Sequence, residues 1–199
     1  MMLLLLIVTA CSVFILSKWS QLTIEAAMNA ANIEFDQIIY ETMYKDSIVI
    51  FYTNKDNLSA GRLTKNVFGY QWTGGSGSDD FAQDAAITWS ISNFTPKEPY
   101  DEEDIITIAK GVIHDEKISE LTIHFKDAED VKATVIEIDR GRVWYAFSDS
   151  PVNSSPDVTI QYKDGTMKGV SEKYFWDTPF APRMVRIYSD HRRSTALSG

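Results

Sequence analysis

The feature that most constrains this chain is a succession of short segments in which apolar and polar residues alternate. From residue 34 onward the pattern has a period of two, which is the side-chain period of a β-strand. The alternation predicts strands at residues 37–44, 47–53, 59–65, 67–73, 85–92, 105–113, 119–126, 131–138, 142–148, 158–163 and 167–173. Short strands separated by turn residues are typical of antiparallel sheets. We therefore expect a mainly β, β-sandwich-like fold.

One short helix is expected before the strands, within residues 20–32. Thr23 is a suitable N-cap, Glu25 lies in the first turn, and Asn32 is a suitable stop. Leu22, Ala26, Met28 and Ala30 are expected to be packing residues of this helix. Residues 74–80, GGSGSDD, predict a flexible loop between strands.

The N-terminal residues 1–16, MMLLLLIVTACSVFIL, contain no charged side chain. Their length is at the short limit for crossing about 30 Å of hydrocarbon. Lys18 and Trp19 follow, as suits a membrane–water interface. We predict a membrane anchor here, because a buried core segment would have a polar face. A cleaved lipoprotein signal with lipid on Cys11 is the alternative, although no basic residue precedes the apolar run.

Residues 94–104 are the best candidate for a boundary, because they combine two prolines with four consecutive acidic residues. This predicts a transmembrane anchor or signal segment at 1–19 and a helix with a β meander at 20–93. An acidic, proline-containing linker at 94–104 and a β-sandwich-like domain at 105–173 follow. Residues 174–199 have no strand pattern and carry four arginines, which predicts an irregular basic tail.

Charge and motifs exclude several classes of function. A net charge of −9 argues against nucleic-acid binding, because an acidic surface repels phosphate. The motifs of nucleotide and zinc sites do not occur in the sequence, so no cofactor and no metal are expected. The acidic residues 101–104, and likewise Asp79, Asp80 and Asp84, are expected to be solvated rather than to bind calcium. The single cysteine excludes an internal disulfide.

Three aromatic residues near the glycine-rich segment, Tyr70, Trp72 and Trp89, are candidates for ligand contact. Aromatic rings can stack on a sugar or a peptide group, and packing in a β core is the alternative. His124 alternates with Leu121, Ile123 and Phe125, so we predict that it points away from their face.

Two stretches resemble a known group of proteins. They are residues 47–72, with IVIFY, NLSAGRLTK and FGYQW, and residues 142–165, with RVWYAF and PVNSSPDVTIQYKDG. Both are similar to uncharacterised membrane-anchored extracytoplasmic proteins of Bacillus-type spore-forming Gram-positive bacteria. The resemblance implies a location outside the cytoplasmic membrane and implies no activity.

From these observations we expect a non-catalytic binding or interaction module of the cell envelope, at the cell membrane with its domain facing outside. Its partners would be the membrane, through the N-terminus, and an envelope protein, peptide or polymer. The spacing of residues assembles no set of nucleophile, base and orienting group, so we expect no enzyme. The alternatives are a secreted hydrolase or inhibitor and a structural subunit of an envelope complex. We also expect Ile50 and Trp144 to matter more for stability than any charged residue.

Overall fold

A computed structural model describes residues 21–77, 79–81, 85–95, 101–152 and 154–170, together with the backbone of 185–187. The predicted anchor at 1–19, with Cys11, lies outside the described residues, as does most of the tail at 174–199. Among the described residues, no helix has the length and apolar character needed to cross a membrane.

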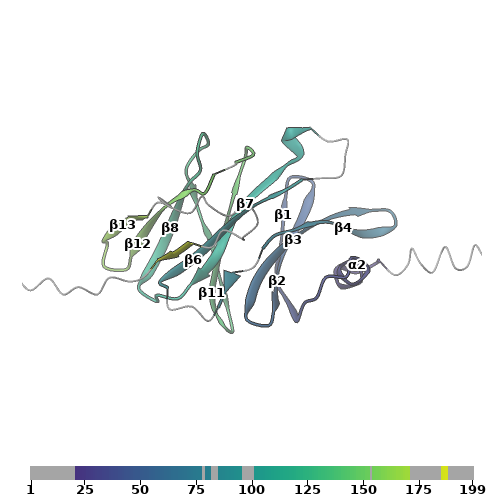
Figure 1. The fold of residues 1–199 in the computed structure, drawn as a ribbon, viewed down its shortest axis with the longest axis horizontal. Helices are drawn as coiled ribbons and strands as arrows, with labels where there is room; N and C mark the ends of the chain where they lie inside the picture. Colours follow the sequence, from purple (N-terminus) through teal and green to yellow (C-terminus); the bar gives the residue numbers. More distant parts are fainter. Residues whose placement is uncertain are drawn as a thin grey trace, which may run out of the picture.

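The described chain forms three antiparallel sheets, one α-helix, α2 (Ile24–Ala30), and one short 3-10 helix, η1 (Glu102–Asp104) (Figure 1). Sheet A contains, in order, β1 (Gln37–Tyr44), β2 (Ser47–Asn54), β3 (Asn57–Asn66) and β4 (Gly69–Gly75), and β5 (Asp79–Asp80) also pairs with β3. Sheet B contains β10 (Thr134–Ile138), β11 (Gly141–Ser148), β7 (Ile106–Ile113), β6 (Ile87–Phe94) and β14 (Val185–Ile187). Sheet C contains β13 (Met167–Val170), β12 (Asp157–Tyr162), β8 (Ile118–His124) and β9 (Val131–Lys132). A mainly β fold with antiparallel sheets and one helix is therefore confirmed.

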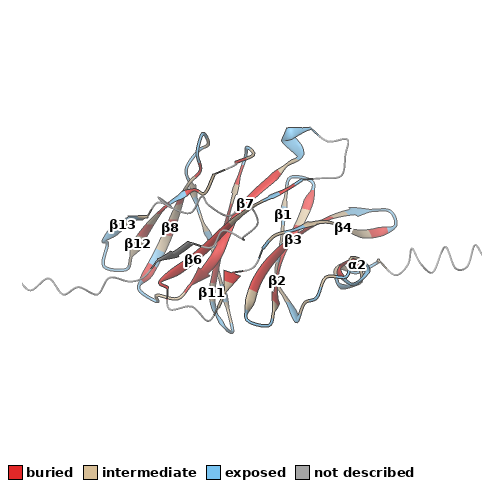
Figure 2. Ribbon diagram, in the orientation of Figure 1, coloured by how far each residue is buried: buried red, intermediate tan, exposed pale blue. Residues whose placement is uncertain are grey.

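Sheet B is the central layer, and strand β7 is buried at all eight positions (Figure 2). One face of sheet B packs against sheet A, in a core that includes Phe51 and Ile108. The other face packs against sheet C, in a core that includes Trp144 and Leu121. A third cluster lies between sheet A and α2 and includes Met28. Burial of apolar side chains on both faces explains why β7 has no polar stripe.

Helix α2 begins where the sequence predicts. The Thr23 Oγ1 atom accepts a hydrogen bond of 3.1 Å from the Ala26 N–H, which satisfies one of the free donors of the first turn. Met28 is buried, as expected. The prediction is wrong for Leu22, which is 52% exposed, and for Ala30, which is also exposed.

The predicted strand at 131–138 is divided between two sheets. Residues Val131 and Lys132 form β9, which pairs with β8 in sheet C. Residues from Thr134 onward form β10, which pairs with β11 in sheet B. The alternation continues across Ala133, and a period of two carries no information about which partner strand lies alongside.

The segment at 74–80 is not a loop throughout, which corrects the sequence prediction. Gly74 and Gly75 end β4, and Asp79 and Asp80 form β5. Gly75 allows the Trp72 indole ring to pack against the backbone, because a Cβ atom at position 75 would lie 2.8 Å from that ring. Composition alone suggested a flexible loop, whereas the strand pairing and the Trp72 contact fix most of the segment.

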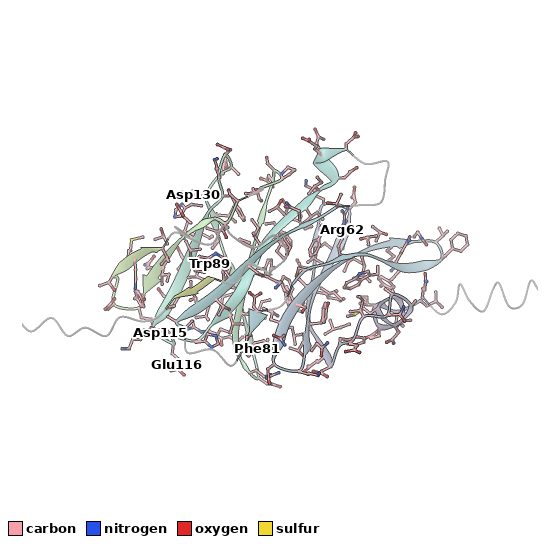
Figure 3. The ribbon with its side chains drawn as sticks, in the orientation of Figure 1. Arg62, Phe81, Trp89, Asp115, Glu116 and Asp130 are labelled. Atoms are coloured by element: carbon pink, nitrogen blue, oxygen red, sulfur yellow. The ribbon has the colours of Figure 1, made fainter. Side chains whose placement is uncertain are left out.

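The acidic segment at 94–104 joins β6 to β7, and sheet B takes strands from both sides of it. The buried guanidinium of Arg62, on β3, donates 3.1 and 3.0 Å hydrogen bonds to the carbonyl oxygens of Phe94 and Asp104 (Figure 3). Sheet A therefore holds both ends of this segment. Within the predicted tail, Val185–Ile187 form β14 beside β6.

Candidate functional site

The outer face of sheet C carries a row of polar side chains. On β8, Leu121 and Ile123 are buried against sheet B, and His124 points to the opposite face. The His124 side chain is 34% exposed, so its predicted outward orientation is confirmed. On β12, Val158 and Ile160 are buried, and Thr159 lies between them on the outer face.

His124 connects a carboxylate to a hydroxyl. The Asp130 Oδ1 atom lies 2.8 Å from His124 Nδ1, and the Thr159 Oγ1 atom lies 2.8 Å from His124 Nε2. A carboxylate only accepts hydrogen bonds, so Nδ1 carries the hydrogen. In the neutral imidazole Nε2 then accepts from the Thr159 hydroxyl. We call these three residues, Asp130, His124 and Thr159, the His124 row.

Local chain geometry brings the row together. Asp127 adopts a positive φ of 62° in the turn after β8, and this reversal returns the chain so that β9 runs beside β8. Asp130 comes directly before β9. Across the other edge of β8, Asp157 pairs directly with His124, so Thr159 is the next residue of β12 on the same face.

A shallow groove of about 300 Å³ lies beside the row, lined by His124, Asp157, Val158, Thr159, Gly169 and Val170. Gly169 is the cross-strand partner of Thr159 on β13. A Cβ atom built on Gly169 would meet no atom within 4 Å, so the surface next to the Thr159 hydroxyl is open. A ligand can therefore approach both the hydroxyl and the imidazole from solvent.

The distances in the row satisfy the contact requirements for a nucleophile, a base and an orienting carboxylate. Acyl transfer also needs free N–H groups that stabilise the developing oxyanion. The backbone of β12 is paired with β8 on one edge and with β13 on the other, so its N–H groups around Thr159 are used by the sheet. The backbone of β12 around Thr159 therefore offers no free N–H group for an oxyanion.

The sequence prediction missed two members of the row. Asp130 and Thr159 lie 6 and 35 positions from His124, and no spacing motif connects them. The only available signal was the alternation in β8, which predicted that His124 faces outward. The pairing of β8 with β12 decides which hydroxyl meets the ring, and that register is a long-range property.

A second polar cluster is buried between sheets A and B. The Lys110 ammonium contacts the Asp79 carboxylate and donates hydrogen bonds to Ser90 Oγ at 3.1 Å and the Gly77 carbonyl oxygen at 2.8 Å. The Lys110 and Asp79 side chains are 1% and 0% exposed. Burial raises the pKa of Asp79, while Lys110 and Ser90 act to lower it. We call Lys110, Asp79 and Ser90 the Lys110 cluster.

The prediction that Asp79 is a solvated acidic residue is wrong. Its carboxylate faces the central sheet because Leu58 and Asp79 are cross-strand partners, which places β5 over Lys110. The Lys110 cluster joins β5 to sheet B. Since all three side chains are buried, a ligand cannot reach them, and we assign the cluster a structural role.

The three predicted ligand-contact aromatics lie in two different clusters. Trp89 is fully buried between sheets B and C (Figure 3). Tyr70 and Trp72, on β4, are partly buried against the cluster under α2.

Among the described residues, no group of three or more His, Cys, Asp or Glu side chains could hold a metal ion.

Comparison of the chain with protein-family models, curated proteins and solved structures finds no match. The candidate site therefore rests on the geometry of the His124 row and its groove. Neither a relative nor a structural neighbour supplies a ligand for it.

We expect the His124 side chain to contribute little to folding. The contacts of this partly exposed side chain are hydrogen bonds worth about 1 kcal/mol, so His124→Ala should lower the free energy of unfolding by no more than about 1 kcal/mol in a urea titration. A loss above about 2 kcal/mol would show instead that the row holds sheet C together.

Proposed function

We propose that this protein is a membrane-tethered extracytoplasmic domain that binds an extended peptide or polymer of the cell envelope on the outer face of sheet C. The observation that carries the proposal is the His124 row beside an open groove. The Thr159 hydroxyl, the His124 imidazole and the Asp157 carboxylate line this groove, and the Asp130 carboxylate contacts the imidazole from the side.

The position of sheet C in the molecule supports this proposal. Along the longest axis, β12 and β13 lie at one end, and α2 lies at the other (Figure 1). The apolar residues 1–16 precede α2 in the chain. A domain tethered through those residues would hold α2 near the membrane and present sheet C toward the cell envelope.

The form of the groove favours an extended ligand. At about 300 Å³ it is at the lower limit of the range for sites of drug-sized molecules, and it is shallow, whereas such sites bury most of the ligand. The polar groups of the His124 row, which lies beside the groove, follow the direction across the strands, from Asp130 through His124 to Thr159. A peptide or glycan chain lying across β8 and β12 could exchange hydrogen bonds with each of them.

The test is sedimentation of the full chain with purified peptidoglycan, and in parallel with peptides released from the cell envelope. Thr159→Val keeps the shape of the side chain and removes its hydroxyl. One hydrogen bond contributes about 0.5–1.5 kcal/mol, so we expect affinity to fall about 2- to 13-fold for Thr159→Val. His124→Gln should weaken binding by a similar factor or more.

Thr64→Val is the matched control, because it makes the same substitution on β3 of sheet A, away from sheet C. It should leave binding unchanged. Equal binding by the wild-type chain and the two row variants would contradict the proposed site.

A hydrolase is the second candidate, favoured by the two 2.8 Å contacts of His124. Treatment with a fluorophosphonate probe separates the two candidates. An adduct on Thr159 that is lost in His124→Gln would assign the row to acyl transfer. We expect no labelling at Thr159.

A further inference from the structure

Large apolar side chains are exposed at the end of the molecule that carries α2. Val67 and Phe68 form the bend between β3 and β4 and are 92% and 61% exposed, and Leu22 is 52% exposed. We call Leu22, Val67 and Phe68 the apolar tip. Figure 2 shows the end of this hairpin as an exposed projection beside α2. Removing one such side chain from water contributes about 1.5–3 kcal/mol, so the tip favours contact with an apolar phase.

The bend is fixed in shape and joined to the start of the described chain. The Asn66 Oδ1 atom accepts a 2.8 Å hydrogen bond from the Phe68 N–H, which stabilises the turn. The Tyr70 N–H donates a 2.7 Å hydrogen bond to the Gln21 carbonyl oxygen. Gly69 has a φ of 115°, and a Cβ atom there would lie 2.3 Å from the same oxygen. The hairpin therefore packs directly on Gln21.

The length of chain before Gln21 limits how far the β3–β4 hairpin can lie from a membrane that holds residues 1–16. Only residues 17–20 separate the apolar run from Gln21. Four residues span at most about 14 Å when fully extended. If residues 1–16 occupy the bilayer, the bend of the hairpin is held within a short distance of the lipid surface.

We propose that the apolar tip inserts into the membrane interface as a second contact beside the N-terminal tether. This inference rests on the proposed tethering of residues 1–16. The exposed Lys65 lies with its ammonium 5.1 Å from the centre of the Tyr70 ring, and both residue types suit the region of the lipid headgroups.

The contact is apolar in character. The chain has a net charge of −9, which opposes attraction to anionic lipid, so neutral phosphatidylcholine should be sufficient. A few apolar side chains bind a bilayer weakly, since even a single myristoyl chain gives only marginal attachment. The tip orients the tethered domain and does not replace the tether.

The experiment uses the full chain in phosphatidylcholine vesicles, with Cys11→Ser as the background. Val67→Cys receives a fluorophore that is sensitive to the polarity of its surroundings. The matched control is Met167→Cys, because Met167 is also apolar and 67% exposed but lies on β13 at the other end of the molecule. We expect the label at position 67 to shift to shorter wavelength and to be quenched by nitroxide lipids. The label at position 167 should do neither.

Flotation of the vesicles separates the two proposals. If the chain floats with the vesicles while the label at position 67 behaves as in water, the tip contact is wrong and the tether stands. If the chain does not float, the tether is wrong, and the tip contact that depends on it is wrong as well.

Discussion

Lys110→Met is expected to lower the free energy of unfolding by about 3–5 kcal/mol, because it removes one partner of a buried ion pair. The Asp79 carboxylate would remain fully buried without its cation. Burial already raises the pKa of Asp79, so the protein would take up a proton there or separate β5 from sheet B. Urea titration of the full chain measures the loss.

Lys132→Met provides the matched control, because it also replaces the lysine of a strand ion pair by methionine, but in a pair that is exposed rather than buried. Lys132 and Glu120 are 2.9 Å apart and exposed, so the expected loss is about 0–1 kcal/mol. The double variant Lys110→Met with Asp79→Leu should recover most of the lost stability, since a buried apolar pair leaves no uncompensated charge. Equal losses for Lys110→Met and Lys132→Met would contradict the structural role of the Lys110 cluster.

The sequence predicts that Ile50 and Trp144 contribute more to stability than any charged residue, and the expected loss for Lys110→Met changes that ranking. Both are fully buried. Lys110, however, lies in a strand whose eight residues are all buried, and its ammonium has a carboxylate partner. A lysine among alternating residues normally indicates a solvent-facing position, so the sequence offered no sign of this arrangement.

Local patterns predicted local structure well. Strand β1 covers the residues that the alternation predicts, and Thr23 caps α2. Both depend on interactions between near neighbours in the chain, which a sequence displays directly. The period of two also placed His124 on the outer face of sheet C.

The polar clusters could not be predicted because they depend on which strands lie side by side. Lys110 and Asp79 are 31 positions apart, and His124 and Thr159 are 35 positions apart. A one-residue change of register would move each partner to the opposite face of its strand. The assignment of β9 to sheet C and β10 to sheet B is a similar long-range choice, and it positions Asp130 beside His124.

Trp144→Ala is expected to produce a loss of similar size, about 3–5 kcal/mol, from lost burial and the cavity left behind. The Trp144 indole lies in the core between sheets B and C, and its Nε1 donates a 3.2 Å hydrogen bond to the Thr88 carbonyl oxygen. Gly111 lies beside this hydrogen bond, and a Cβ atom on Gly111 would lie 1.8 Å from the Thr88 carbonyl oxygen. A glycine in the central strand is therefore required for β6, β7 and the indole to pack together.

Two further variants separate the contributions of the indole. Trp144→Phe keeps much of the apolar volume and leaves the Thr88 carbonyl oxygen without this donor, so about 1–3 kcal/mol should be lost. Trp72→Ala removes a partly buried indole from the edge of sheet A and should cost less than Trp144→Ala. If Trp72→Ala were the more damaging of the two, the main core would lie under α2 rather than on sheet B. Urea titrations of Trp144→Ala, Trp144→Phe and Trp72→Ala give three midpoints. At equal m-value these midpoints rank the losses in the free energy of unfolding.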